Sequence, residues 1–259
     1  MRRPAVRVGN DVVDLDDPRT SGKAGDERFV ARILDAAGLA ALREADDPDL
    51  ELWCRWAAKE AAYKVASKLA GTPPPFVHRA FGVTWGAADA RATGAHPARE
   101  ARPIRHGVVT YEGRAIPVLV TCGVEAGRPC ALHALARFGP ASRADGWDVA
   151  PGLDLLDRRA APWSGSLEDL ERRLTERELD GVRTRRSAAV RLAARASLAG
   201  RMGLPEERVE IVCDSGPLGR RPPRVLVDGE PSGADVSLSH DGRWIAWSSW
   251  TATGAGGAP

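Results

Sequence analysis

Residues 53–71 read WCRWAAKEAAYKVASKLAG, and the spacing of their apolar residues is that of a helix. The preceding DDPD offers capping residues and the following GTPPP stops the helix, so we predict that it begins near Leu50. A Lys59-Glu60 doublet interrupts the alanines and aromatic residues that this helix would bury. The question is why charged residues stand in a face that should be buried.

Glu60 lies one helical turn after Trp56 and one turn before Lys64, so these three side chains share a face. One interpretation is an exposed Glu60–Lys64 pair, worth about 0.3–0.5 kcal/mol. The other is a partly buried carboxylate that binds a metal or acts as a base, with Lys64 directed at the same anionic ligand. The helix alone leaves both interpretations open.

Asp11 lies in a strand predicted over residues 5–15, AVRVGNDVVDL. A charge among valines is unfavourable unless it is paired, and a metal ion is one suitable partner. Side chains alternate along a strand, so Asp11 and Val13 face one way and Asp14 faces the other. The alternative is that Asp11 only begins a turn or caps a helix.

The remaining sequence predicts an α+β protein of two similar-sized halves without a close sequence repeat. Helical and strand patterns fill a first half, residues 1–139, including a helix over residues 27–45. A Gly-, Pro- and Ser-rich linker is predicted at 140–165. A second half, residues 166–250, would begin with helix over 166–204, and residues 251–259 would form a loose tail.

The second half offers two candidate phosphate-binding features. In VSLSHDGRW, Ser239 and His240 end a strand at a probable turn, where a hydroxyl and an imidazole can hold phosphate oxygens, although a lone histidine is usually structural. The arginine series VRTRRSAAVRLAARASLAGR is either a solvated helix face or a row facing a polyphosphate.

Composition excludes several other classes of protein. A net charge of +2 gives no signal for nucleic acid, and no long apolar run indicates a membrane span. The four cysteines stand far apart, as expected of reduced packing residues in a cytoplasmic protein. A glycine-rich phosphate loop, a GxSxG elbow and zinc-ligand spacing are all missing from the sequence.

Taken together, GNDVVDL, Arg28-Phe29, WAAKEAAYK and SLSHDGRW resemble the 4'-phosphopantetheinyl transferase superfamily. Residues 72–165 match it only in general α+β character. The resemblance implies transfer of 4'-phosphopantetheine from coenzyme A to a serine of an apo acyl or peptidyl carrier protein, with Mg²⁺ and release of adenosine 3',5'-bisphosphate.

The resemblance also implies roles for individual residues. Asp11 and Glu60 would hold Mg²⁺ against the coenzyme A pyrophosphate, and Glu60 or a metal-bound water would accept the proton of the carrier serine. Lys64 would stabilise the leaving phosphate, with help from Lys59. The residues expected to bind coenzyme A phosphates are Ser239 and His240, with Arg186 or Arg195 at the 3'-phosphate.

Motif order suggests a rearranged member of this superfamily. In the two-halved surfactin-synthetase-activating type the SH segment precedes the acidic strand, whereas here it follows. Small trimeric holo-acyl-carrier-protein synthases have the present order and, like this chain with Val13, lack the second acid of the strand. We therefore expect a circularly permuted pseudodimer with one site between its halves, for which a monomer suffices and in which water completes the metal shell.

Two other functions remain open at this stage. The first is a catalytically degenerate module that binds coenzyme A or a carrier protein, an interpretation that Val13 favours. The second is an unrelated metal-dependent phosphotransferase or hydrolase that uses Asp11 and Glu60 on another nucleotide. The Ala- and Arg-rich composition makes polyketide or peptide pathways plausible clients, without distinguishing them from fatty-acid synthesis.

Overall fold

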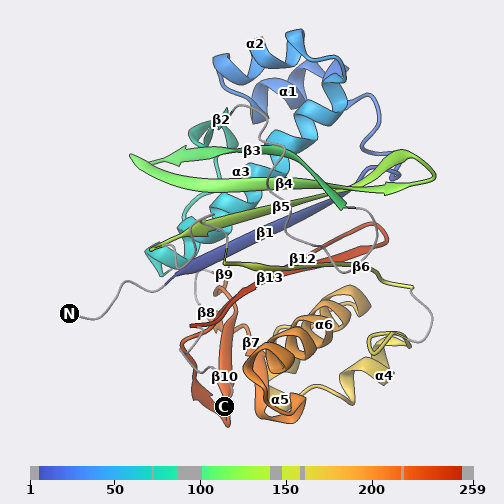
Figure 1. Ribbon diagram of the computed structural model, residues 1–259, viewed down its shortest axis with the longest axis vertical. Helices are drawn as coiled ribbons and strands as arrows, with labels where there is room; N and C mark the ends of the chain where they lie inside the picture. The colour runs from blue at the N-terminus through green and yellow to red at the C-terminus, as the bar shows by residue number, and fades with distance from the viewer. Residues whose placement is uncertain are drawn as a thin grey trace, which may run out of the picture.

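The computed structural model describes residues 6–71, 73–86, 101–140, 148–157, 161–216 and 219–252. Its helices and antiparallel strands confirm the predicted α+β class. Figure 1 shows two layered parts stacked along the longest axis, the upper with a five-stranded sheet and the lower with smaller sheets around α6. Most of the predicted tail lies outside the described residues.

The upper part contains one helix-covered antiparallel sheet, with strand order β1-β5-β4-β3-β2. The long helix α3 packs across one face of this sheet. The elements are, in chain order, β1 (Arg7–Asp14), η1 (Lys23–Gly25), α1 (Glu27–Ile33), α2 (Ala36–Glu44), α3 (Pro48–Ala70), η2 (His78–Ala80), β2 (Gly82–Trp85), β3 (Ala101–Tyr111), β4 (Arg114–Glu125) and β5 (Arg128–Phe138).

Helix α3 begins and ends where local signals place it. The Asp47 side chain accepts a hydrogen bond from the Leu50 amide at 3.0 Å, and Pro48 stands in the first turn. Gly71 ends the helix with φ 76°, a conformation that glycine adopts without strain. The helix therefore starts two residues before the predicted position.

The close packing of α3 on β1 depends on small residues. Ala57, Ala58 and Ala61 are fully buried against the sheet. Gly9 of β1 lies directly beneath Ala61, whose carbonyl oxygen would collide with any Cβ at position 9. Larger side chains at these places would push α3 away from the strand that carries Asp11.

Two predicted helices are divided in the structure. The helix expected over 27–45 is interrupted because Leu34 is extended and Asp35 starts α2 by accepting a hydrogen bond from the Gly38 amide at 2.8 Å. The helix expected over 166–204 is three helices, because each has its own capping residue: Ser166, Thr175 and Thr184.

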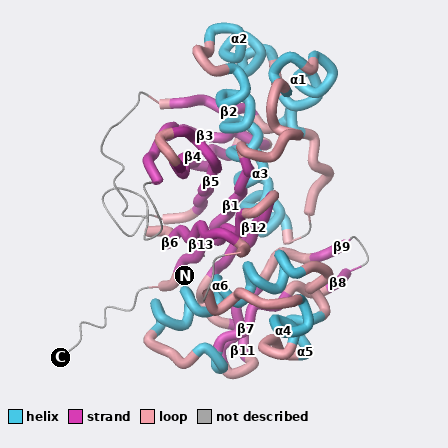
Figure 2. Tube along the Cα trace, turned by 90° about the vertical axis from the view of Figure 1, so that its right-hand side faces the viewer, coloured by secondary structure: helices cyan, strands magenta, loops and turns pink. Residues whose placement is uncertain are grey.

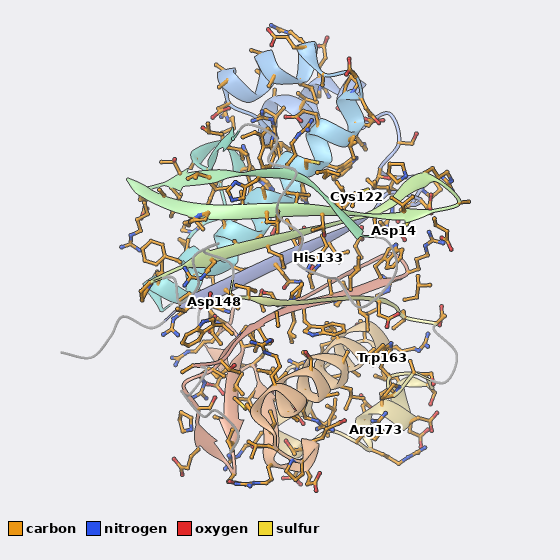
Figure 3. The ribbon with its side chains drawn as sticks, in the orientation of Figure 1. Asp14, Cys122, His133, Asp148, Trp163 and Arg173 are labelled. Atoms are coloured by element: carbon orange, nitrogen blue, oxygen red, sulfur yellow. The ribbon has the colours of Figure 1, made fainter. Side chains whose placement is uncertain are left out.

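The lower part surrounds α6 with strands. Its sheets have the orders β12-β13-β6, β11-β10-β7 and β8-β9, and Trp163, labelled in Figure 3, packs in the core formed with α6. The elements are β6 (Ala150–Leu155), α4 (Leu167–Glu171), α5 (Glu176–Leu179), α6 (Arg185–Met202), η3 (Glu206–Arg208), β7 (Val209–Val212), β8 (Ser215–Gly216), β9 (Gly219–Arg220), β10 (Arg224–Val227), β11 (Glu230–Pro231), β12 (Asp235–Asp241) and β13 (Trp244–Trp250).

The predicted linker, residues 140–165, contains the strand β6. Residues 152–157 read GLDLLD and repeat the GxDxxD pattern of GNDVVD at residues 9–14 in β1. Connectivity repeats as well: β1 pairs antiparallel with β5 and β5 with β4, as β6 pairs with β13 and β13 with β12. Each part therefore opens with a strand that pairs with its own last strand.

The two parts meet along the edges of β1 and β12, which lie side by side in Figures 1 and 2. Backbone amides of β1 donate to side-chain oxygens of β12 at a constant spacing in sequence, so the two strands run parallel. The pairs are Val8 with Asp235 (2.7 Å), Asn10 with Ser237 (3.1 Å), Val12 with Ser239 (3.2 Å) and Asp14 with Asp241 (2.9 Å). We call this contact the seam.

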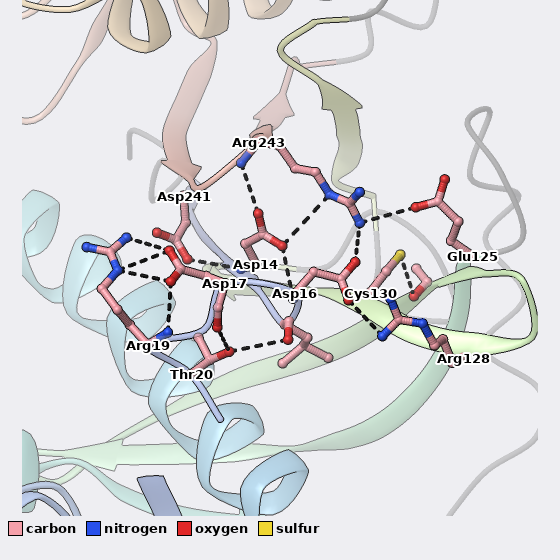
Figure 4. Close-up of polar contacts among 12 residues, drawn as sticks. Asp14, Asp16, Asp17, Arg19, Thr20, Glu125, Arg128, Cys130, Asp241 and Arg243 are labelled. Atoms are coloured by element: carbon pink, nitrogen blue, oxygen red, sulfur yellow. Dashed lines mark hydrogen bonds and ion pairs between the residues drawn. The ribbon is translucent and has the colours of Figure 1, made fainter. Parts of the chain in front are cut away.

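The turn after β12 closes one end of the seam, as Figure 4 shows. The Asp14 carboxylate accepts a hydrogen bond from the Arg243 amide at 2.9 Å. The Arg243 guanidinium also pairs with Asp16 and with Glu125, the latter at 3.1 Å. Asp14 is thus engaged by the turn between β12 and β13, as expected if it faces away from Asp11.

Candidate functional site at the seam

Lys68 of α3 bridges the two strands at the end of the seam nearest the N-terminus of β1. Its ammonium donates to the carbonyl oxygens of Val8 (2.7 Å) and Val236 (2.6 Å), and to the Asp235 carboxylate at 2.8 Å. The Lys68 side chain is 5% exposed, and burial lowers its pKa while Asp235 opposes that change. Lys68 therefore acts as a structural cation between the two parts.

Lys64 repeats this arrangement one helical turn earlier. Its ammonium donates to the carbonyl oxygens of Asn10 (2.7 Å) and Leu238 (3.5 Å) and to Asp11 Oδ1 at 3.1 Å. The Asp11 carboxylate also accepts a hydrogen bond from the Ser239 hydroxyl at 2.9 Å. Lys64 thus joins the seam to the acid that the sequence singled out.

Glu60 stands one further turn along the same face of α3. By the register of the seam, the next carbonyls are those of Val12 and His240, and both residues line, together with Glu60 and Asp11, a cavity of about 390 Å³. Two carbonyl oxygens and a carboxylate are all hydrogen-bond acceptors and cannot bond to one another. Where a third lysine would continue the pattern, α3 therefore has a carboxylate.

Asp11 and Glu60 affect one another electrostatically across this cavity. Burial raises the pKa of Asp11 to about 6; the Lys64 ammonium opposes that rise and the Glu60 carboxylate adds to it. Asp11 is 9% exposed, and the hydrogen bonds from Lys64 and Ser239 both end on its Oδ1. The two acids that the sequence proposed as metal ligands therefore face a common space.

The donor set at this cavity suits Mg²⁺, which proteins hold through one or two carboxylates together with water and substrate phosphates. Val13 is 3% exposed and packs in the core under α3, so it supplies no further acid. In the part of the chain that the structure describes, no group of three or more His, Cys, Asp or Glu side chains is placed to bind a metal alone. Asp11 and Glu60 fit a metal whose remaining ligands are water and phosphate.

A larger cavity of about 560 Å³ lies between α3 and α6 and shares Asp11 and His240 with the smaller one. Lys64 and Ser239 also line it. Among its other lining residues are Arg191, which belongs to the arginine series of the sequence analysis, and Arg221, which that analysis did not single out, next to Pro222, Pro223 and Tyr63. Cationic and apolar groups thus line a cavity that adjoins the carboxylate site at Asp11 and His240.

His240 and Arg186 stand near each other at the boundary of the two parts. Desolvation of the ring and the positive charges of Arg186 and Lys64 lower the pKa of His240, so the neutral imidazole is favoured at neutral pH. Hydrogen bonds from Arg19 lower the pKa of Asp17, which lines the smaller cavity, and the Arg186 charge adds to that decrease. Arg186 is exposed near the beginning of α6, within electrostatic reach of the site.

Lys59 lies apart from both cavities, contrary to its expected role at coenzyme A. It is 1% exposed, and its ammonium donates to the carbonyl oxygens of Ile33 at 2.7 Å and His78 at 3.1 Å. Successive residues of a helix point about 100° apart, so Lys59 and Glu60 serve different faces. Burial lowers the pKa of Lys59 to about 8.

Arg195 is also removed from the site by its packing. Its guanidinium is buried and donates to Glu178 Oε2 and to the Arg173 carbonyl, both at 2.9 Å. Arg191, one turn earlier on α6, is the arginine of this series that reaches the larger cavity. The arginine-rich pattern was visible in the sequence, but the rotation of α6 that selects among its members was not.

Comparison with known proteins gives one result for this region. Residues 7–109 match the family model described as the 4'-phosphopantetheinyl transferase superfamily, which confirms the resemblance over most of the upper part. The match includes Asp11, Glu60 and Lys64 and ends before Ser239 and His240. No curated protein matches the chain. Among the described helices, none is both long and apolar enough to span a membrane.

Proposed function

We propose, from the superfamily match over residues 7–109, that this chain transfers 4'-phosphopantetheine from coenzyme A to a serine of an apo carrier protein. The match itself supports a transferase of phosphopantetheine groups in general. The observation that favours the full reaction is the cavity shared by Asp11 and Glu60, which continues into a larger cavity with cationic and apolar walls.

Asp11 and Glu60 would hold Mg²⁺, which when bound neutralises charge on the pyrophosphate of coenzyme A. The Ser239 hydroxyl and the Lys64 ammonium keep the Asp11 carboxylate directed into the cavity. Burial disfavours the charged form of Asp11, so a cation bound in the cavity would stabilise its carboxylate.

The transfer step needs a base, a path for the leaving group and no further reagent. The hydroxyl oxygen of the carrier serine forms a bond to the phosphorus that bears the pantetheine arm, and the bond from that phosphorus to the bridging oxygen breaks. Adenosine 3',5'-bisphosphate leaves with the bond's electron pair. Glu60 accepts the serine proton, and Lys64 places positive charge beside the leaving phosphate.

Coenzyme A would occupy the larger cavity. The exposed Arg221 offers a guanidinium group for phosphate oxygens, together with Ser239, His240 and the nearby Arg186. Arg191 lines the same cavity, but its Nε and Nη1 already donate to the carbonyl oxygens of Ile211 and Ser187. Pro222 and Tyr63 offer apolar surface to the adenine or the pantetheine arm. This assignment replaces Lys59 and Arg195, whose side chains are engaged elsewhere.

The repeated connectivity of the two parts supports a pseudodimeric, circularly permuted arrangement in which one chain builds one site. Lys68 and Lys64 already join the parts within the single chain, so we propose that a monomer is active and that it works in the cytoplasm. The arginines around the larger cavity suit an acidic carrier, acyl or peptidyl, from fatty-acid, polyketide or peptide synthesis.

The test is to incubate the protein with Mg²⁺, coenzyme A and apo carrier proteins, and to measure the mass of each carrier. The expected result is a gain of one phosphopantetheine group that chelation of the metal abolishes. Unchanged mass across several acyl and peptidyl carriers would contradict the proposal.

A binding module is the second candidate, because Val13 leaves the site with two acids instead of three. Calorimetry separates the two functions. Coenzyme A binding that is insensitive to Mg²⁺, without transfer to any carrier, would favour the module.

A further inference from the structure

His78 lies beside Glu60 but belongs to no motif of the sequence analysis. Its ring is held between two aromatic rings, with centroid distances of 4.5 Å to Trp56 and 4.0 Å to Phe76. Its Nε2 is buried without a hydrogen-bond partner among the described residues, and stands 3.8 Å from Glu60 Oε1. A buried polar atom of this kind costs free energy unless some state of the protein uses it.

The backbone that carries His78 is fixed from two sides. Its carbonyl oxygen accepts a hydrogen bond from the Lys59 ammonium and one from the Phe81 amide, both at 3.1 Å. Lys59 also bonds to the Ile33 carbonyl, which ties η2 to the end of α1. Lys59 and Glu60 therefore act on the same imidazole, one through its backbone and the other through its ring.

Glu60 is the less restrained member of this pair. Its side chain is 22% exposed, and no residue in the described ranges donates a hydrogen bond to its carboxylate. The separation of 3.8 Å exceeds a hydrogen bond, and a shift of roughly 1 Å in the Glu60 carboxylate would close it. Carboxylates that ligate metals are in turn hydrogen-bonded by neighbouring groups that orient them.

We propose that His78 is a positioning residue whose Nε2–H donates to one oxygen of Glu60 and leaves the other oxygen for the metal. The inference rests on the proposed function, since it needs a cation between Glu60 and Asp11. The ring packing fixes the direction of the Nε2–H donor. His78 therefore restricts the orientations of the Glu60 side chain before the cation binds.

Two variants separate the donor from the ring. His78→Phe keeps an aromatic ring between Trp56 and Phe76 but removes the donor, whereas His78→Gln keeps an N–H donor and loses the ring. Arg79→Ala, at the exposed next position of η2, is the matched control. Thermal unfolding of each variant checks that it folds.

The measurement is a titration with Mn²⁺ alone, which prefers the same oxygen ligands as Mg²⁺, followed by electron paramagnetic resonance. We expect His78→Phe to weaken Mn²⁺ binding about 10–100-fold. His78→Gln and Arg79→Ala should stay close to the unmodified protein. Transfer assays should show the same order in kcat, with the KM for coenzyme A unchanged.

Equal Mn²⁺ affinity in the unmodified protein and His78→Phe would overturn the inference and leave the proposed function standing. A loss in His78→Gln as large as that in His78→Phe, or larger, would also overturn it, because the retained N–H donor would then not support binding. If Mn²⁺ does not bind the unmodified protein, or if Glu60→Gln leaves its binding unchanged, the proposed function is contradicted as well.

Discussion

Two levels of the seam use one geometry for different purposes. At the first level the Lys68 ammonium bonds to two carbonyl oxygens and a carboxylate, and its side chain is 5% exposed. Two helical turns earlier, Glu60 takes the corresponding place on α3 and lines a cavity of about 390 Å³. Lys64 stands between them and takes part in both.

This difference separates levels of the seam that hold the two parts together from a level that lines a cavity. The i, i+4 spacing of α3 brings Glu60, Lys64 and Lys68 to successive levels of the seam. Two levels contain their own cation, and the third contains a carboxylate beside Asp11. Under the proposed function, a dissociable cation would complete the level at which an anion stands in place of the lysine.

The largest expected effect is at the Glu60 level of the seam, with Glu60→Gln. The variant should lose about 10²–10⁴-fold in transfer rate, because it loses both a metal ligand and the proposed base. Its fold should be intact, since the side chain is partly exposed. Initial rates from carrier mass, with the exposed Glu44→Gln as control, check this; unchanged rates would remove Glu60 from the chemistry.

At the Lys68 level, Lys68→Met should lower the free energy of unfolding by about 3–5 kcal/mol, because the buried Asp235 would lose its close cation and keep only Arg7 at 3.9 Å. Urea denaturation measures the loss. Adding Asp235→Asn to Lys68→Met should recover part of it, since the buried charge is then gone. A loss no larger than that of a surface substitution would show that the lysine level is not structural.

Asp11→Asn should stabilise the metal-free protein while it weakens metal binding. Because the folded pKa of about 6 exceeds the ordinary 3.8, protonated Asp11 favours folding, and that contribution is complete below 3.8 and lost as pH rises through 6. At pH 8 with chelator, we expect the variant to be about 1–3 kcal/mol more stable. The gain should shrink between pH 8 and pH 5; a variant less stable at pH 8 would contradict the account.

The smallest effect concerns the seam's hydroxyl groups. Ser237→Ala leaves the Asn10 amide without its acceptor and should cost about 1 kcal/mol of unfolding free energy. Ser248 lies opposite Ser237 on β13, and its buried hydroxyl has no hydrogen-bond partner in the described part of the chain. Ser248→Ala should therefore leave the free energy of unfolding nearly unchanged. Equal losses in Ser237→Ala and Ser248→Ala would show that the bond from Asn10 to Ser237 does not stabilise the seam.

Local signals were sufficient for much of the fold. Asp47, Pro48 and Gly71 determine the ends of α3 through contacts a few residues away, so sequence spacing predicts them within two residues. The strand β6 escaped prediction because it is short and lies among turn-forming residues. The sequence signal that could have identified β6 is GLDLLD, which repeats the pattern of GNDVVD.

For the site as well, the motifs implied the placement of some residues and not of others. The placement of Asp11 and Glu60 on one cavity agrees with what the motifs implied, whereas Lys59 and Arg195 depend on helix rotation and packing that no motif encodes. The alternating Asp and Ser residues of β12 were visible as a pattern of period two. That they bond to the edge of β1, more than 200 residues away, follows only from the tertiary structure.

Anomalous X-ray scattering from crystals grown with Mn²⁺ and coenzyme A tests the central claim most directly. The account predicts one Mn²⁺ peak within bonding distance of the carboxylates of Asp11 and Glu60 and of a pyrophosphate oxygen, at the level of the seam that contains no lysine. A peak elsewhere, or coenzyme A bound with no metal between these two acids, would contradict it.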